Sequence, residues 1–254
     1  MNHILETRRR AHAATLAAQA LLVFATVVEV WRYPVKSLLG EQLNEVRVEE
    51  RGVVGDRLYA VTDRSGKIGS GKTTRRFRRL DGLFDLRARD GGERPIVTLP
   101  DGRELLAGDP ELDAYLSTRY HEELRVLRED GVPHHDAAPL HLLTTSSLRW
   151  LENRLPGSRI DLRRFRPNVL LDAAGAALVE DAWVGRRFAL GSATIRVVER
   201  TERCVMTTNA QSDLPKDPEV LRAVTELNDT CLGIYASVDE GGLVRVGDSL
   251  RALS

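Results

Sequence analysis

The chain has 254 residues, which is enough for one large domain or two smaller ones with a buried core, so a disordered chain is not expected. Its 37 Lys and Arg residues balance 37 Asp and Glu residues, and this neutral charge gives no reason to expect nucleic acid as a partner. The only cysteines are Cys204 and Cys231, which excludes a disulfide scaffold or a cysteine-rich zinc domain and fits the reducing cytoplasm.

Residues 1–26 form an N-terminal extension of uncertain status. Three arginines at 8–10 precede residues 11–28, which contain no Lys, Arg, Asp or Glu, a pattern typical of a weak signal peptide or membrane anchor. Polar residues such as His12 and Gln19 interrupt it. We therefore expect a helical extension of a cytoplasmic protein without firm membrane contact; membrane association or export through residues 1–26 is the alternative.

From residue 27 onward, short apolar and β-branched runs are separated by Gly, Pro, Asp and Asn, which predicts many short strands. With few helices at the periphery, such strands indicate a mainly β (α+β) fold built on β-barrels. The expected strands are Val27–Trp31, Leu43–Val48, Arg57–Thr62, Leu83–Ala88, Ile96–Leu99, Leu124–Leu127, Leu140–Thr144, Val169–Leu171, Thr194–Glu199, Gly233–Val238 and Leu243–Val246.

Three helices are predicted by their end signals. Asp109 and Asp217 are each followed by a proline, which places a capping side chain before a proline at the first helical position. A third helix is expected to begin at Thr145 or Ser146 and to end before Pro156. Loop residues interrupt the pattern near 118–136, so we expect one domain over residues 27–118 and a second over residues 119–254.

Residues 66–73, Gly-Lys-Ile-Gly-Ser-Gly-Lys-Thr, match the phosphate-loop pattern GxxxxGK(S/T) in full. Such a loop requires a strand that runs directly into its first glycine and a helix that begins at its Lys-Thr. Here residues 63–65 separate Gly66 from the expected strand, and the chain lacks the regular alternation of strands and helices of a nucleotide-binding sheet. A glycine-rich hairpin is the preferred interpretation, and a nucleotide-binding loop is the third functional hypothesis.

Cys204 has a local sequence that favours a thiolate, because Arg203 precedes it and polar residues follow it. Cys231 is expected at the end of a helix with no nearby cation, and there a small buried side chain is the default interpretation. A bridge between the two is disfavoured in a thiol-poor chain. Of two arginine clusters, residues 75–79 are expected on a solvated face, while residues 163–166 could provide positive potential for a small anion.

Five motifs in this order resemble the MOSC family, whose domains are related to the C-terminal part of molybdenum cofactor sulfurase and to the amidoxime-reducing component. The resemblance spans about residues 27–252 and implies a smaller N-terminal β-barrel domain followed by a MOSC-type β-barrel. The motifs are Tyr-Pro-Val-Lys-Ser at 33–37, Gly-Val-Val-Gly-Asp-Arg at 52–57, Phe-Arg-Pro-Asn at 165–168, Glu-Asp-Ala-Trp at 180–183 and Arg-Cys-Val-Met-Thr-Thr at 203–208.

The resemblance implies a molybdenum cofactor (molybdopterin), with Cys204 as the thiolate ligand of the metal, a role that suits a soft sulfur donor. Arginine would give bidentate recognition of the cofactor's phosphate, and the start of a helix offers free N–H groups and hydroxyls. Arg203 is expected to bond the pterin or to hold the loop, and Asp136 to have a structural role in a loop. The residues that match the family's cofactor-binding positions, or that offer such groups, are Lys36, Ser37, Arg57, Thr144, Thr145, Ser146, Arg166, Asn168 and Arg203.

The function implied by the resemblance is an oxidoreductase that reduces small N-hydroxylated substrates by two-electron oxygen-atom chemistry. The chain has no segment for a domain that uses pyridoxal phosphate and too few cysteines for an iron–sulfur cluster, so electrons are expected from a separate ferredoxin- or cytochrome-like protein or a reductase. The alternative is a non-enzymatic cofactor carrier or sulfur-delivery module. His134 and His135 are expected at the surface, because the preceding Pro133 suggests an exposed loop.

Overall fold

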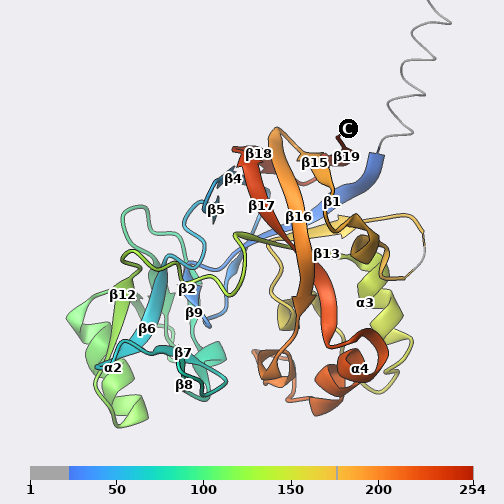
Figure 1. Ribbon diagram of the computed structural model, residues 1–254. Coiled ribbons are helices and arrows are strands. Elements are labelled where there is room, and N and C mark those ends of the chain that lie inside the picture. Colours follow the sequence, from blue (N-terminus) through green and yellow to red (C-terminus); the bar gives the residue numbers. More distant parts are fainter. Residues whose placement is uncertain (1–22, 176, 254) are drawn as a thin grey trace, which may run out of the picture.

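The computed structural model describes residues 23–175 and 177–253. Figure 1 shows two modules side by side, a barrel module that carries α3 and α4 and an N-terminal module that carries α2. Of the extension predicted over residues 1–26, residues 1–22 lie outside the described residues. Residues 23–26 already belong to β1 (Val23–Arg32), so any extension ends before Val23.

The barrel is a ring of seven strands, because β1 pairs with both β14 and β19 and thereby closes the sheet. The β-barrel that the sequence predicts is thus confirmed. In order around the ring the strands are β14 (Val169–Asp172), β13 (Leu140–Thr144), β17 (Cys231–Glu240), β16 (Ala193–Glu202), β15 (Arg187–Leu190), β19 (Ser249–Ala252) and β1. Beside the ring, β3 (Glu41–Leu43) extends β1, and β18 (Gly242–Arg245), β4 (Glu45–Glu49) and β5 (Gly52–Val53) form a small sheet.

Alternation of apolar and polar residues along the barrel strands explains the closed shape, since every second side chain points inward. Ile195 and Val197 of β16, for example, are buried in the interior, whereas the intervening Arg196 is exposed. Outside the ring, Leu143 and Leu170 pack against α3 (Thr145–Glu152) and α4 (Pro218–Asn228) in a second apolar layer. The helices therefore cover one side of the barrel.

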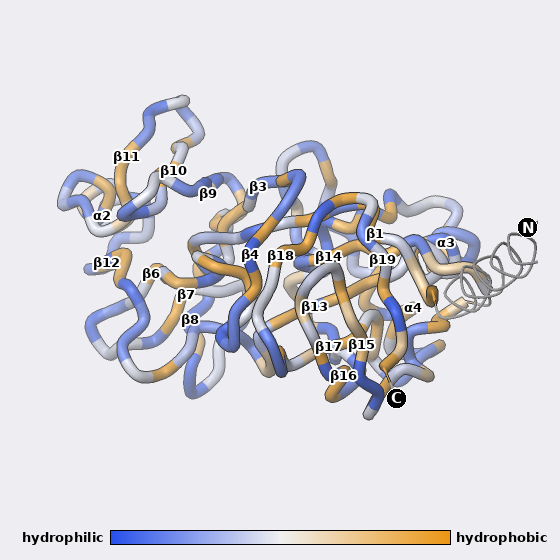
Figure 2. The backbone as a smooth tube through the Cα atoms, turned by 90° about the horizontal axis from the view of Figure 1, so that it is seen from above, coloured by the Kyte–Doolittle hydropathy of each residue, from blue (hydrophilic) through white to orange (hydrophobic). Residues whose placement is uncertain are grey.

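The N-terminal module contains two small sheets and a helix around a separate apolar core. Leu86, Leu112 and Leu124 are fully buried there, and the tube of Figure 2 shows the module as a second lobe beside the barrel. One sheet contains β2 (Val35–Lys36), β6 (Tyr59–Asp63), β7 (Ile68–Ser70), β8 (Phe77–Arg79) and β12 (Leu124–Arg128). The other contains β9 (Arg87–Arg89), β10 (Ile96–Thr98) and β11 (Glu104–Leu106), and the helix is α2 (Pro110–Tyr120).

The two modules do not divide at residue 118. Strand β12 pairs with β6 along its whole length, so the chain leaves the N-terminal module only after Arg128. Strand β1 belongs to the barrel although it precedes that module in sequence. The N-terminal module is therefore inserted between strands of the barrel in two pieces, first β2 and then β6 to β12, with β3, β4 and β5 on the barrel side between them.

Three local expectations differ from the structure. The strand predicted over Leu83–Ala88 is a 3-10 turn, η1 (Leu83–Asp85), followed by β9, because Gly82 with φ 81° turns the chain there. Cys231 is the first residue of β17 and not the end of a helix. The phosphate-loop hypothesis for residues 66–73 is wrong in geometry, since β7 runs through the motif and β8, not a helix, follows it.

The helix starts follow the sequence closely. The side chains of Asp109 and Asp217 accept hydrogen bonds from the backbone N–H groups two residues later, and a proline occupies the first turn of each helix. Within residues 23–175 and 177–253, none of the helices has the length and apolar character needed to cross a membrane.

Truncation of Phe188 tests the interior packing of the barrel. Its ring is fully buried and meets Phe24 edge-on, with 5.5 Å between the ring centroids. We expect Phe188→Ala to lower the free energy of unfolding by about 3–5 kcal/mol, because a large cavity is left behind. Chemical denaturation measures this value. As a control, Val184→Ala at a 41% exposed position should change it by less than about 0.5 kcal/mol, and equal losses in the two variants would contradict the assigned interior.

Candidate functional site

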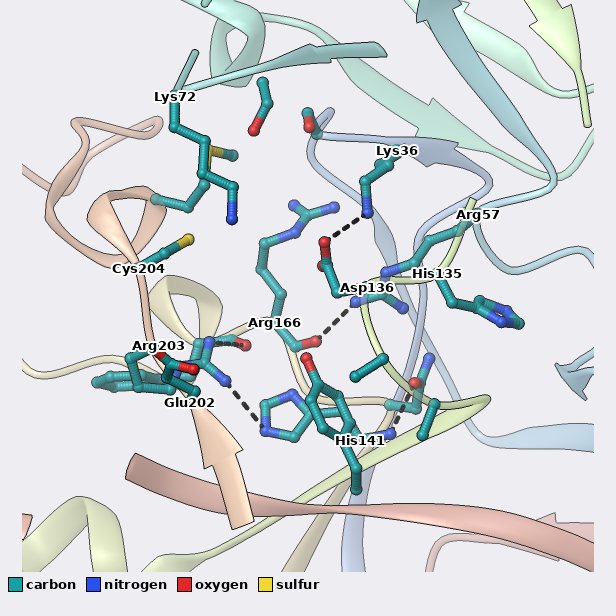
Figure 3. A pocket seen from close by; sticks show the side chains of 18 of the residues that line it. Lys36, Arg57, Lys72, His135, Asp136, His141, Arg166, Glu202, Arg203 and Cys204 are labelled. Carbon is teal, nitrogen blue, oxygen red and sulfur yellow. Dashed lines mark hydrogen bonds and ion pairs between the residues drawn. The ribbon is translucent and has the colours of Figure 1, made fainter. Parts of the chain in front are cut away.

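A cavity of about 410 Å3 lies between the two modules. Its wall carries seven Lys and Arg side chains but only three acidic ones, so the cavity favours an anion. Figure 3 shows these side chains converging from both modules. Seven of the ten residues predicted from the sequence line it, namely Lys36, Ser37, Arg57, Arg166, Asn168, Arg203 and Cys204.

Lys36 and Asp136 form an ion pair across the two modules, with 3.0 Å between Nζ and Oδ1. The Lys36 side chain is almost fully buried, and burial lowers its pKa to about 8 although Asp136 opposes the shift. The Asp136 carboxylate is half exposed to the cavity; burial raises its pKa, but Lys36 and Arg57 outweigh this and lower it to about 2. Asp136, expected only in a loop role, is thus the counter-ion of a candidate cofactor residue.

Arg57 is held by the fully buried Asp56, which pairs with its guanidinium and also accepts a 2.7 Å hydrogen bond from the N–H of Tyr33. A second bond, 3.0 Å long, runs from Arg57 Nη2 to the carbonyl oxygen of Arg166. The Tyr33 ring lies against both guanidiniums, 4.8 Å from that of Arg57 and 4.2 Å from that of Arg166. One aromatic ring and one carboxylate therefore hold two like charges together.

Ser37, Arg57 and Arg166 all have left-handed backbone conformations, with φ of 67°, 50° and 56°. Residues other than glycine adopt this region at a cost of about 1–3 kcal/mol, which is found mainly at functional sites. Burial, followed by the charge of Arg57, lowers the pKa of Arg166 to about 10. One of its amino groups, Nη2, is buried without a hydrogen-bond partner among the described residues. Strain and an unpaired donor together indicate a site built to bind an anion.

Arg203 follows β16 and precedes the cysteine. Its Nη2 donates to the carbonyl oxygen of Phe165 at 2.6 Å, its Nη1 lies 3.3 Å from Nε2 of His141, and its Nε is buried and unpaired within the described chain. Burial, together with the charge of Arg203, lowers the pKa of His141 well below its usual value. A neutral His141 then accepts from Arg203 through Nε2 and orients the guanidinium.

Cys204 begins the short 3-10 turn η4 (Val205–Thr208), and its side chain points into the cavity (Figure 3). The turn is fixed by Thr207, whose N–H and hydroxyl both donate to the carbonyl oxygen of Cys204, at 3.0 and 2.9 Å. The fully buried Arg164 donates to the carbonyl oxygens of Thr207 and Pro215. Arg164 thus holds the backbone of the cysteine loop. Both cysteines are free.

Not every predicted residue faces the cavity with free polar atoms. Asn168 lines it, but its amide oxygen accepts from the N–H of His141 at 3.2 Å and its amide nitrogen donates to the carbonyl oxygen of Trp31 at 3.3 Å. The three hydroxyl residues at the start of α3 lie outside the cavity lining. Thr144 caps α3 and donates to Glu180 at 2.7 Å, Thr145 donates to Asp172 at 2.7 Å, and Ser146 pairs with Thr144 at 2.8 Å.

The surface location expected for His134 and His135 is wrong. Both side chains are less than 9% exposed, because the segment after Arg128 runs between the modules instead of around them. The backbone N–H of His134 donates to Glu129 at 2.9 Å, and His135 lines the cavity. Burial, reinforced by the charge of Arg51, lowers the pKa of His135 to about 4.

Sequence reasoning missed Lys72, His141 and Tyr235 as cavity residues. His141 and Tyr235 lie opposite each other in the register of β13 and β17, which a single sequence does not reveal. Lys72 was noticed only as part of the phosphate-loop pattern. Of the clustered arginines, Arg78 and Arg79 are exposed as expected, while Arg164 and Arg166 are buried at the cavity.

The donor set limits which group the cavity could hold. Within the described residues no three His, Cys, Asp or Glu side chains form a cluster that could hold a metal ion. A metal bound at the Cys204 sulfur would therefore need further ligands from an organic cofactor. The unpaired donors of Arg166 and Arg203 fit an anionic group of such a cofactor.

Stability above neutral pH tests the buried charge of Lys36 in protein free of ligand. The folded state lowers the pKa of Lys36 from 10.5 to about 8, so between these values the unfolded state binds more protons and stability rises with pH. We expect wild type to gain up to roughly 3 kcal/mol over Lys36→Met between pH 8 and 10.5, at about 1.4 kcal/mol per unit. Urea unfolding at several pH values measures the difference. If the difference in stability does not change with pH, burial does not lower the pKa of Lys36.

Comparison with known proteins agrees with this architecture. Residues 129–251 match the MOSC domain, and residues 24–99 match the MOSC N-terminal beta barrel domain. The chain is 24% identical to mitochondrial amidoxime reducing component 2 of Rattus norvegicus, over 88% of this chain and 82% of that protein. It is 23% identical to mitochondrial amidoxime-reducing component 1 of Mus musculus, over 90% of this chain and 82% of that protein.

A solved structure, the YuaD protein from Bacillus subtilis, has a similar fold, with a TM-score of 0.52 and 14% identity over 90% of this chain and 94% of that one. At this identity the likeness concerns the fold alone. The two matched domains together cover most of the described chain, in the order in which the N-terminal module and the barrel follow one another. The chain therefore belongs to the MOSC family and carries both the MOSC domain and its N-terminal beta barrel domain.

Proposed function

We propose that this chain is a molybdenum-cofactor oxidoreductase that reduces small N-hydroxylated compounds. The observation that carries the proposal is a free thiol, Cys204, that opens into a cavity with seven cationic side chains, two of which have unpaired buried donors. The amidoxime-reducing names of the relatives support the choice of reaction class. When bound, the molybdenum cofactor supplies the two-electron oxygen-atom chemistry.

The residues of this chain would bind the cofactor and orient it. Arg57 and Arg166, fixed by Asp56 and Tyr33, present permanent positive charge to a phosphate. Arg203 has a free Nε for the same anionic group or for a ring edge. The Cys204 sulfur, on a turn held by Thr207 and Arg164, would serve as the protein ligand of the metal.

Protons are required as well, because reduction of an N–OH group to N–H and water consumes two electrons and two protons. Lys36 Nζ, with a pKa lowered to about 8, can release a proton near neutral pH, and Asp136 receives its hydrogen bond. Tyr235 stays protonated, since burial raises its pKa to about 12. We propose that the electrons come from a separate donor protein and that the reaction takes place in the cytoplasm.

Replacement of Cys204 tests the proposal. In protein purified from a host that makes the cofactor, Cys204→Ser should contain much less molybdenum than wild type and should reduce benzamidoxime with a reduced dye more than about 100-fold more slowly, because the protein ligand is lost. Elemental analysis and product chromatography measure the two quantities. Cys231→Ser is the matched control, since Cys231 lies outside the cavity lining, and it should behave as wild type.

Equal molybdenum in Cys204→Ser and wild type would rule out the ligand role. A carrier or sulfur-delivery module would instead contain substoichiometric, easily lost molybdenum and would not turn over benzamidoxime. Steady turnover by wild type excludes that alternative.

A further inference from the structure

Lys72 lies in the wall of the cavity at a place that the phosphate-loop pattern does not explain. The preceding Gly71 directs its N–H at the sulfur of Met206, 2.9 Å away, so this loop of the N-terminal module rests on the cysteine turn. A side-chain carbon at Gly71 would lie only 2.5 Å from Asn209 Nδ2 and 2.6 Å from that sulfur, so the two loops are closely packed here. The glycine-rich segment therefore places Lys72 near Cys204.

Among the described residues, the ammonium of Lys72 makes no direct polar contact, although its charge acts on the Asp136 carboxylate at longer range. Within the part of the chain that the structure describes, its ammonium has no hydrogen-bond or ion-pair partner and lies 5.0 Å from the centre of the Phe77 ring. Within the described residues, each other cation of the cavity wall makes at least one direct polar contact. Lys36 pairs with Asp136, Arg57 with Asp56 and Arg200 with Asp181, whereas Arg164, Arg166 and Arg203 donate to backbone carbonyls.

Lys72 also lies apart from Lys36 and Arg57. In Figure 3 it points into the cavity from the wall that carries Cys204, while Lys36 and Arg57 occupy the opposite wall. Both ammonium groups lie near the Phe77 ring, with Lys36 Nζ 5.4 Å and Lys72 Nζ 5.0 Å from its centre. An anion at Lys72 would thus lie on the thiol side of the cavity, where a substrate must approach.

We infer that Lys72 binds the carboxylate of the substrate, so that the preferred substrates are N-hydroxylated compounds that carry a carboxylate group. The inference rests on the proposed function and adds a substrate class to it. A half-buried ammonium without a counter-ion gains more from a substrate carboxylate than an ammonium already paired, because it gives up no existing contact. Lys67 lies on the same hairpin but outside the cavity lining, so it cannot reach a substrate in the cavity and serves as a matched control.

The test compares 4-carboxybenzamidoxime with benzamidoxime. For wild type we measure the ratio of kcat/KM for the charged substrate to that for the neutral one, and we expect Lys72→Gln to lower this ratio about tenfold. Lys72→Arg keeps the charge and should keep the ratio within about threefold, and Lys67→Gln should leave it as in wild type. The ratio should also fall as salt is raised.

An unchanged ratio in Lys72→Gln would overturn the inference. A loss of molybdenum in Lys72→Gln would overturn it too, since Lys72 would then hold the cofactor. Ligand-observed NMR with 4-carboxybenzamide and benzamide provides a readout without turnover. If wild type reduces neither amidoxime, the proposed function fails. Weaker binding of 4-carboxybenzamide to Lys72→Gln than to wild type would then still support the anion site. Equal binding to the two proteins would refute it.

Discussion

The cavity between the modules concentrates positive charge that the carboxylates of the protein neutralise only in part. Two buried guanidiniums, those of Arg57 and Arg166, share the Tyr33 ring, and among the described residues Asp56 is the only fully buried carboxylate that pairs with either of them. Burial lowers the pKa of Arg166 and Arg203, which means that their charged forms are costly in the empty fold. An anion in the cavity would offset that cost. The left-handed backbone at Ser37, Arg57 and Arg166 belongs to the same arrangement, since the structure holds these residues in a costly conformation around the cavity.

The barrel and most of the candidate site could be predicted from the sequence because their signals are local. An alternating run defines β16, and prolines after Asp109 and Asp217 define helix starts. Arg57, Arg166 and Cys204 lie in short motifs whose resemblance to the MOSC family carries their assignment. These features require only a few neighbouring residues to be recognised.

What could not be predicted depends on contacts distant in sequence. The pairing of β12 with β6 moves the module boundary to Arg128, and no local pattern reveals this register. His135 is buried at the cavity between the modules, a location that its local sequence does not indicate. Thr144 and Thr145 have the right chemistry for an anion, but Glu180 and Asp172 already bind their hydroxyls. The hydroxyl pattern is thus a poor guide when acidic partners come from other segments.

The position of β1 bears on how the chain is made. Its ring partners β14 and β19 leave the ribosome only after the whole N-terminal module, and β19 ends at residue 252. The module has all its strands by Arg128 and can fold while β1 still lacks both of its ring partners. During most of synthesis β1 therefore exposes an apolar face and an open edge, features that promote association with other chains. The yield of folded protein should therefore depend on how long β1 stays exposed, which slow translation would lengthen and a strand-binding chaperone would protect. The strands of the N-terminal module depend on these factors less.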